Sequence, residues 1–197
     1  TELMKQVREI NSKREKQDYY DCIDFNKYKH IEFVLDNLIN EENNIATDKY
    51  GKKVNLKKFV INWMAHTIQM RAKIGTSIVF ISPMQGTGKS FFCDEIYGKF
   101  FGQYYATVDN NTFTELHNGL IDNKLFLMFD EGNIPSELRD KVAAKLKVAI
   151  SQENMTVRKM RTEQENKRSI FNMIINTNEK IPFKIDRNDR RYTCLKT

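Results

Sequence analysis

The pattern of apolar and polar positions along the chain changes near residue 75. Before that point, apolar residues recur every three or four positions over residues 26–40 and 56–68, which predicts two amphipathic helices. Asn55 is a candidate N-cap of the second helix, and the polar residues 43–54 predict a loop between the two. We therefore expect a small helical domain over residues 1–75.

After residue 75, short apolar runs alternate with helical patterns. The expected strands are residues 77–81, 104–108, 124–131, 155–160, 169–175 and 191–195. The expected helices are residues 89–97, 110–116 and 135–151. The charged residues 161–168 predict a hairpin tip between two of the strands. This alternation is typical of an α/β fold with a mainly parallel sheet, here over residues 76–197.

A glycine-rich segment separates the first expected strand from the first expected helix. Residues 85–90 read Gln-Gly-Thr-Gly-Lys-Ser, and a strand, a glycine-rich turn and Lys-Ser at a helix start form the layout of a phosphate-binding P-loop. Backbone N–H groups and the helix dipole favour an anion there. Pro83 stands where the usual pattern has its first glycine, so an ordinary glycine-rich turn is the alternative. The candidate nucleotide-binding residues are Gln85, Gly86, Thr87, Gly88, Lys89 and Ser90.

The residues around this segment predict ATP and Mg²⁺ as ligands. Lys89 is expected to reach the β- and γ-phosphates, and the Ser90 hydroxyl is expected to ligate Mg²⁺. Asp130 and Glu131 end a run of five apolar residues, which is typical of a buried parallel strand. We expect Asp130 to hold the metal through its water shell and Glu131 to orient and deprotonate the attacking water. The lack of an Asn-Lys-x-Asp motif argues against GTP.

Two further sets of polar residues are candidates for the same site. Asn178 ends the next apolar strand, and ligands gather at the carboxyl ends of parallel strands, so it is a candidate for contact with the γ-phosphate or the water. Asn176 is the competing candidate on the same face, and the alternative for both is a simple strand cap. One residue of a basic turn is a candidate arginine finger, with an exposed turn as the alternative. These candidates are Arg187, Arg190 and Arg191.

The expected hairpin has a local excess of positive charge. Its basic residues are Arg158, Lys159, Arg161, Lys167 and Arg168, against Glu163 and Glu165. Such a hairpin is suited to contacts with nucleic-acid phosphates, and a solvated hairpin is the alternative. Because the tip has no aromatic residue, base stacking is not indicated there.

Composition sets a few limits on the class of protein. The 197 residues carry a net charge of +6, which suits a polyanionic partner without requiring one. The three cysteines Cys22, Cys93 and Cys194 lie far apart, which argues for a reducing compartment and against a zinc site. No apolar run is long enough for a membrane helix, and the charged start is no signal peptide, so we expect a cytoplasmic protein without a membrane partner. The chain opens on Thr1, as a fragment of a longer protein would.

The order of these motifs resembles that of a known family. Gln-Gly-Thr-Gly-Lys-Ser, Phe-Leu-Met-Phe-Asp-Glu, the basic hairpin, Met-Ile-Ile-Asn-Thr-Asn and Asp-Arg-Arg-Tyr are similar to motifs A, B, B′ and C and the arginine finger of superfamily 3 helicases. The likeness is to the helicase part of phage and plasmid primase–helicase and primase–polymerase proteins of the poxvirus-like branch, over residues 55–197. It implies a P-loop NTPase with an AAA+-like core.

The resemblance also implies roles and partners. In that family, Asn178 would be the sensor, Arg190 or Arg191 would act on the ATP of the neighbouring subunit, and Lys159 with its basic neighbours would face DNA in the channel of a ring. The ring is usually a homo-hexamer that moves on single-stranded DNA, in the host cytoplasm if the gene belongs to a phage or plasmid.

The sequence therefore predicts an ATP-dependent DNA helicase motor domain of a replication protein. Two other functions stay open at this point. One is a nucleotide-gated DNA-binding or initiator ATPase that does not unwind DNA. The other is a monomeric P-loop phosphotransferase in which the basic hairpin is incidental.

Overall fold

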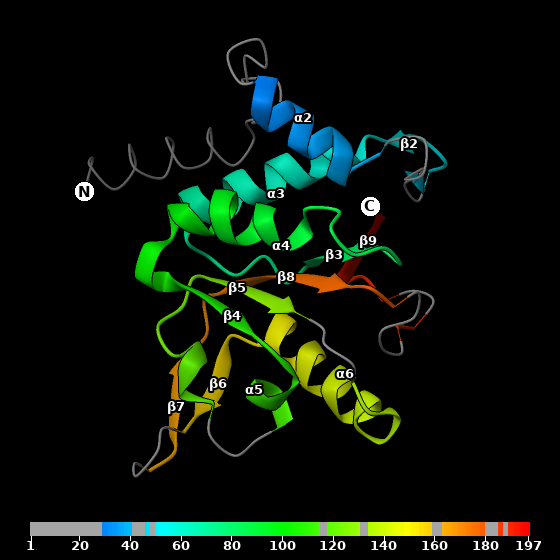
Figure 1. Ribbon diagram of the computed structural model, residues 1–197. Helices are drawn as coiled ribbons and strands as arrows, with labels where there is room; N and C mark the ends of the chain where they lie inside the picture. The colour runs from blue at the N-terminus through cyan, green and yellow to red at the C-terminus, as the bar shows by residue number, and fades with distance from the viewer. Residues whose placement is uncertain are drawn as a thin grey trace, which may run out of the picture.

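A five-stranded sheet forms the centre of the chain in the computed structural model (Figure 1). The strand order is β4-β5-β8-β3-β9, and all four pairings are parallel. The prediction of an α/β fold with a mainly parallel sheet is therefore confirmed. The strands are β3 (Ser77–Ile81), β4 (Tyr105–Val108), β5 (Phe126–Asp130), β8 (Asn172–Thr177) and β9 (Tyr192–Lys196).

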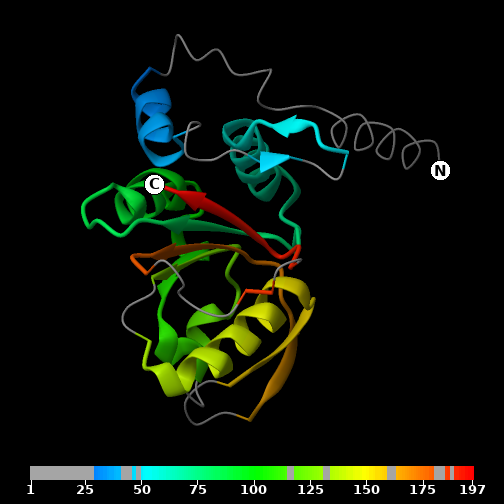
Figure 2. The same ribbon diagram turned by 90° about the vertical axis from the view of Figure 1, so that its right-hand side faces the viewer.

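Helices cover both faces of this sheet (Figure 2). The structure describes residues 29–40, 46–47, 50–114, 118–130, 134–158, 163–179, 185–186 and 189–197. One face carries α2 (Lys29–Leu38), α3 (Leu56–Met70) and α4 (Lys89–Phe91), which continues into a π-helical stretch, Phe92–Tyr97. The other face carries α6 (Ser136–Ser151) and the short α5 (Asn110–Thr114).

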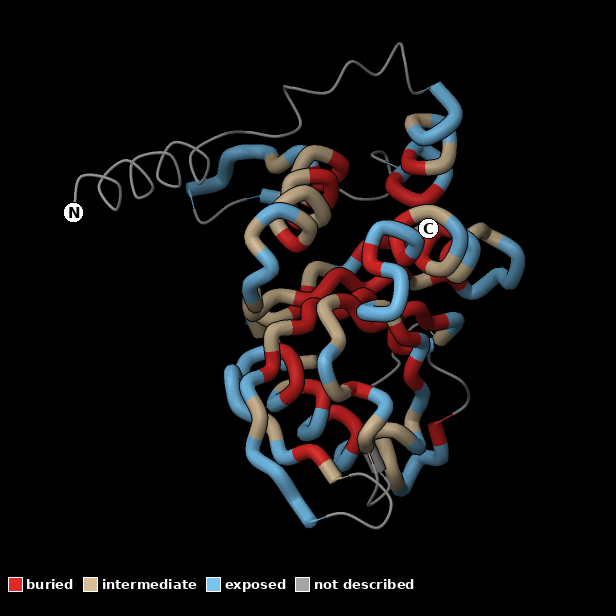
Figure 3. Tube along the Cα trace, turned by 90° about the vertical axis from the view of Figure 1, so that its left-hand side faces the viewer, coloured by how far each residue is buried: buried red, intermediate tan, exposed pale blue. Residues whose placement is uncertain are grey.

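The sheet is buried on both faces, so successive strand residues enter two different cores (Figure 3). Ile78, Phe80 and Phe126 pack with α3 and the π-helical stretch, whereas Val79 and Leu127 pack with α6. Burial on both sides explains why the strands read as continuous apolar runs rather than as alternating ones. The apolar spacing of residues 135–151 predicts five inward positions. Leu138 is half-buried against the core, and the other four, Val142, Ala143, Leu146 and Ile150, are buried.

The two amphipathic helices before β3 are present as predicted. Asn55 is the N-cap of α3, and its side chain accepts a hydrogen bond from the backbone N–H of Lys58 at 2.8 Å. The apolar stripe of α3 packs in the same core as one face of the sheet. The proposed division between residues 75 and 76 stays a prediction, and it runs through this continuous core.

Two predictions for loops need correction. Residues 43–54 were expected to be a loop, but they contain β1 (Ala46–Thr47) and β2 (Lys53–Val54), which pair antiparallel. The sequence also predicts that the pair Asn110-Asn111 caps the helix that follows β4. Instead, the Asp109 carboxylate accepts the backbone N–H of Thr112 at 3.1 Å, one residue earlier.

The hairpin also differs from the prediction. Its strands are β6 (Asn154–Val157) and β7 (Glu165–Arg168), and β7 lies within the segment expected to be the tip. The apolar run expected as the second hairpin strand is β8, which belongs to the central sheet. Polar composition led to this error, because no residue of β7 is buried, whereas its partner β6 has the buried Val157 to mark it as a strand.

Candidate nucleotide-binding site

The loop between β3 and α4 is shaped by two glycines. Gly86 and Gly88 have φ values of 78° and 88°, and a Cβ atom at either position would meet open space. The left-handed backbone, not crowding, is therefore what favours glycine here. The Ser82 N–H donates to the carbonyl of Thr177 at 3.0 Å, which ties the start of the loop to the end of β8.

Lys89 is buried beneath this loop, with 7% of its surface exposed. Its Nζ donates to Thr87 Oγ1 at 3.2 Å and to Asn178 Oδ1 at 3.0 Å. Burial lowers the pKa of Lys89, and the negative charge of Asp130 opposes this effect. The side chain is thus a cation held in a partly dry position by neutral oxygens, which suits it to an anionic ligand.

Strand order explains how residues far apart in sequence meet here. Because β8 lies between β3 and β5, the carboxyl end of β8 lies between the glycine-rich loop and Asp130. Asn178 follows β8 directly and is exposed, and its side chain reaches from the end of β8 to Lys89. We call this end of the sheet the carboxyl edge.

Asp130 ends β5 at the carboxyl edge. Burial and the nearby carboxylate of Asp94 raise its pKa, and the charge of Lys89 opposes the rise. Asp94, on the π-helical stretch, accepts hydrogen bonds from the hydroxyls of Tyr105 and, at 3.2 Å, Thr107. Asp94 is not among the predicted site residues, since nothing in the sequence places a residue of this helix beside Asp130.

Asn176 has a different environment from Asn178. It is 1% exposed, and its Nδ2 contacts Met128 Sδ at 3.1 Å and Cys93 Sγ at 3.8 Å. Its Oδ1 is buried without a hydrogen-bond partner in the described part of the chain. Of the two competing asparagines, Asn178 is therefore the one that touches Lys89, while Asn176 lies under the site.

These side chains line a pocket of about 390 Å³ at the carboxyl edge. A second hollow beside it shares Asp130 and Asn178 and extends toward β4 and α5. The first pocket is lined by Gln85, Gly86, Thr87, Gly88, Lys89, Ser90, Phe91, Asp130, Asn176 and Asn178. The candidate nucleotide-binding residues of the sequence analysis thus lie together with Asp130 and Asn178.

Two of the three arginine candidates, Arg190 and Arg191, do not line this pocket. Arg190 is exposed, and Arg191 forms an ion pair with Asp189 at 2.9 Å. Both precede β9, and the carbonyl of Arg191 accepts the N–H of Ser77 at the start of β3. They therefore lie at the opposite end of the sheet, the amino edge, about 16 Å away for a five-residue strand. Arg187 and Glu131 lie outside the described residues.

The described hairpin candidates, Arg158, Lys167 and Arg168, are also absent from the lining of the pocket. Arg168 and Lys167 pair with Asn154 and Met155, so they lie near the base of the ribbon rather than at its tip. Lys167 forms ion pairs with Asp122 and Glu165 at 3.1 and 3.0 Å. The backbone of Arg158 exchanges hydrogen bonds with Asn118. Lys159 and Arg161 lie outside the described residues.

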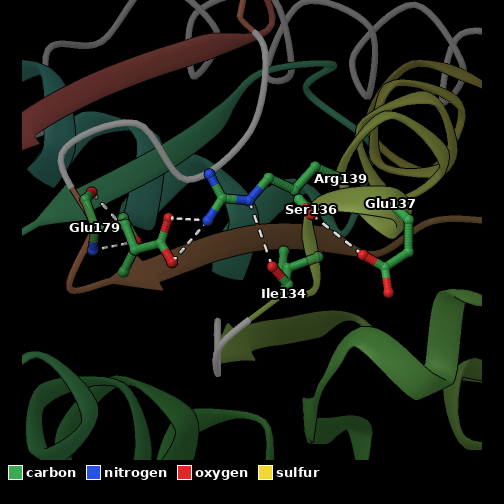
Figure 4. A network of polar contacts seen from close by, with 6 residues as sticks. Ile134, Ser136, Glu137, Arg139 and Glu179 are labelled. Atoms are coloured by element: carbon green, nitrogen blue, oxygen red, sulfur yellow. Dashed lines mark hydrogen bonds and ion pairs between the residues drawn. The ribbon is translucent and has the colours of Figure 1, made fainter.

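Arg139, near the start of α6, forms contacts that were not predicted from the sequence (Figure 4). Its Nη2 donates to both carboxylate oxygens of Glu179, at 3.0 and 2.7 Å, and its Nε donates to the carbonyl of Ile134 at 3.4 Å. Glu179 follows Asn178, and Ile134 lies in the loop after β5. Arg139 therefore links the two loops that follow Asp130 and Asn178.

A metal ion at this site would have few protein ligands. Among the described residues, no group of three or more His, Cys, Asp and Glu side chains is placed to hold a metal ion. Ser90 and Asp130 supply one hydroxyl and one carboxylate beside the same pocket. Hard oxygen donors of this kind, few in number, are typical of Mg²⁺ bound together with a phosphate. None of the described helices is long and apolar enough to cross a membrane.

The chain is similar in sequence and in fold to a phage protein. The chain is 27% identical over 136 residues to the "DNA Primase-polymerase" of Nitratiruptor phage NrS-1, and it spans 19% of that protein's length. A solved structure titled "The A form apo structure of NrS-1 C terminal region-CTR" superposes with a TM-score of 0.70 at 25% identity, over 84% of this chain and 37% of that one. "The apo structure of NrS-1 C terminal region (305-718)" superposes with a TM-score of 0.71 at 24% identity, over the same shares.

One family profile matches residues 80–191, from within β3 to the residue before β9. The match covers more than half of the 197 residues and includes Lys89, Asp130 and Asn178. Its description is "Family of unknown function (DUF5906)", and the chain belongs to this family.

Proposed function

We propose that this chain is the ATP-hydrolysing motor domain of a phage-type DNA replication protein, which moves on single-stranded DNA. The observation that carries the proposal is the Lys89 ammonium, held between the glycine-rich loop and Asn178. The similarity to a phage primase-polymerase supports the link to DNA replication. The P-loop NTPase and AAA+-like identity belongs to the same proposal.

Three residues have separate tasks in the proposed hydrolysis. Lys89 binds the β- and γ-phosphates, and its present partners Thr87 and Asn178 are neutral, so an anionic phosphate replaces them favourably. Asn178 then donates its amide N–H to the γ-phosphate or to the attacking water. Glu131, next to Asp130, takes the proton of that water.

The residues present fit a magnesium ion. Ser90 and Asp130 would hold it beside the phosphates, where it would neutralise developing charge on the phosphate oxygens. Asp130 must be ionised for this role. Its raised pKa therefore implies that magnesium affinity increases as pH rises through the acidic range.

The arginines have a role in this proposal only between subunits. Because Arg190 and Arg191 lie at the amino edge, neither reaches the pocket of its own chain. We propose that one of them contacts the ATP of a neighbouring subunit in a homo-hexameric ring. Mixing Arg190→Ala or Arg191→Ala chains with Lys89→Ala chains should then restore part of the activity, since some mixed interfaces are intact.

The direct test is the rate of ATP hydrolysis with and without single-stranded DNA, for the parent chain and for Glu131→Gln. We expect DNA to stimulate hydrolysis in the parent and Glu131→Gln to abolish it while ATP still binds. Hydrolysis that is unaffected by both DNA and Glu131→Gln would contradict the proposal. A forked-duplex assay then separates a helicase from a nucleotide-gated DNA-binding ATPase, because only the helicase separates the strands.

A further inference from the structure

A broad hollow of about 1340 Å³ lies at the amino edge of the sheet. Its lining comes from the end of α3, from the two short 3₁₀ turns before β4, and from the residues just before β5 and β8. No residue of this lining also lines the pocket around Lys89. The hollow is therefore a second surface, which the proposed ATP chemistry does not use.

Two aromatic rings stand exposed over this hollow. Phe100 is 68% exposed and Tyr104 is 44% exposed, and neither ring contacts another ring in the described residues. Their neighbour Phe101 is 7% exposed and packs with Tyr97 and Phe126 at centroid distances of 5.2 and 5.3 Å. Phe101 thus anchors the segment in the core, while Phe100 and Tyr104 remain free to contact a ligand.

The same hollow carries an excess of positive charge. Arg71 is exposed at the end of α3 and has no ion pair within the described part of the chain. Lys124 donates to the carbonyl of Gln103 at 2.6 Å, and Lys99 forms an exposed ion pair with Glu95. Of the described lining residues, Asp122 alone is acidic, and it is paired with Lys167. An anionic ligand therefore meets three cations here.

The hollow continues toward the basic hairpin. A smaller hollow at the hairpin base includes Lys167 and Arg168 in its lining. The two hollows share Asp122, Asn123, Lys124 and Ile170. Positive side chains therefore follow one surface from β7 to the end of α3.

We propose that this surface binds single-stranded nucleic acid, with bases stacked on Phe100 and Tyr104 and phosphates on Arg71, Lys99 and Lys124. We call these five residues the aromatic–basic groove. Exposed rings beside cations are suited to unpaired bases, because every base has a face that can stack and every nucleotide carries a phosphate. A duplex hides those faces, so a single strand is favoured. This inference rests on the proposed function, because the choice of DNA as the partner comes from that proposal.

The test is the affinity of the 197-residue chain for a fluorescein-labelled thymidine oligonucleotide, measured by anisotropy without nucleotide. We expect Phe100→Ala to weaken binding about tenfold, within the range for losing one stacked base, and Phe100→Trp to retain it. Phe33→Ala is the matched control, because Phe33 is also 68% exposed but lies on α2. Arg71→Ala should lower the salt slope by about 0.7, and Lys145→Ala on α6 should not.

A second readout locates the strand directly. Irradiation of a bound 5-iodouracil oligonucleotide should cross-link the peptide that contains Phe100 and Tyr104. Unchanged affinity in Phe100→Ala and Arg71→Ala, with cross-links confined to the hairpin, would overturn the inference. It would also be overturned if Phe100→Ala bound DNA normally but sedimented differently from the parent, because the surface would then contact a second copy of the chain. Lys89→Ala should keep this DNA affinity while losing ATP hydrolysis, so failure of the groove and failure of the motor are distinguishable.

Discussion

The two edges of the central sheet differ in how they present charge. At the carboxyl edge, Lys89 is buried and Asp130 stands beside it, in a pocket of about 390 Å³. Their pKa values are shifted in opposite directions, that of Lys89 down and that of Asp130 up, with burial as the main cause. At the amino edge, the cations of the aromatic–basic groove border a hollow of about 1340 Å³ with exposed rings.

The difference indicates two kinds of ligand. A buried cation such as Lys89 acts strongly over a short range, which suits a single phosphate group. Exposed cations beside aromatic rings act weakly at each contact but add along a surface, which suits a polymer. The proposed sites for ATP and for DNA are thus separated by the length of the strands of the parallel sheet. Substitutions at one edge should therefore leave the ligand of the other edge bound.

The largest expected effect comes from Lys89→Ala at the carboxyl edge. We expect ATP hydrolysis to fall by at least about 100-fold, because the positive charge next to the transferred phosphate is lost. DNA affinity measured without nucleotide should stay within about twofold. Steady-state ATPase assays and oligonucleotide anisotropy measure the two quantities.

A suitable control for Lys89→Ala is Lys145→Ala, which removes an exposed lysine from α6. It should change neither rate nor DNA affinity. Hydrolysis at the parent rate in Lys89→Ala would show that the pocket around Lys89 does not carry out ATP hydrolysis. The proposed difference between the two edges would then be wrong.

The next effect in size is expected from Arg139, which acts as a positioning residue. Arg139→Ala frees the loops after β5 and β8 from each other, and misplacement of Asn178 should lower kcat about tenfold with little change in KM. Arg139→Lys keeps one charge contact to Glu179 and should restore part of the rate. Both side chains of the pair are about one-third exposed, so the loss of stability should stay below about 1 kcal/mol.

A thermal melt of Arg139→Ala separates positioning from folding. If kcat is unchanged while the melting temperature falls, the contact is structural only. If KM rises and kcat is constant, the link affects ATP binding rather than the placement of Asn178.

A smaller effect is expected at the hairpin. Arg158→Ala and Arg168→Ala should each weaken oligonucleotide binding about threefold and lower the salt slope, since each removes at most one phosphate contact. Hydrolysis of ATP without DNA should not change, because both residues lie away from the pocket. Arg158→Lys is the matched control, since it keeps the charge. If the salt dependence of DNA affinity is the same in the parent and in the alanine variants, DNA does not contact the hairpin.

The sequence predicted the carboxyl edge better than the amino edge. Lys89 and Ser90 follow a strand and a glycine-rich turn, and Asp130 ends an apolar run, so local patterns placed them correctly in the fold. The contact between Lys89 and Asn178 depends on β8 lying between β3 and β5. Strand order is a property of the whole sheet, and no local pattern encodes it.

The amino edge lacked such local signals. Nothing in the sequence separates Phe100 and Tyr104 from Phe101, but in the structure only Phe101 is buried in the core. Arg71, Lys99 and Lys124 lie in three separate segments, so their grouping required the fold. Arg139 was missed for the same reason, because its partners Ile134 and Glu179 come from two different loops.

The smallest effect on function is expected from replacing Lys73, near the amino edge. This substitution should instead change how stability depends on pH. The Nζ of Lys73 donates to the carbonyls of Ala149 and Gln152 and to Ser169 Oγ, at 2.6 to 2.8 Å, and lies 4.5 Å from the centre of the Phe171 ring. It therefore joins the start of β3 to the end of α6 and the hairpin base. Burial lowers the pKa of Lys73 from 10.5 to about 8, and the charge of Glu153 opposes this.

The sign of the pH effect follows from this shift. Between pH 8 and 10.5 the unfolded chain binds more protons at Lys73 than the folded chain, so its contribution to the free energy of unfolding rises with pH across that window. Lys73→Met lacks this contribution. Urea melts at several pH values should thus show the parent gaining stability relative to Lys73→Met, by on the order of 1–2 kcal/mol after solvent screening. A constant difference between parent and variant would mean that the ammonium keeps its ordinary pKa, because its three hydrogen bonds offset burial.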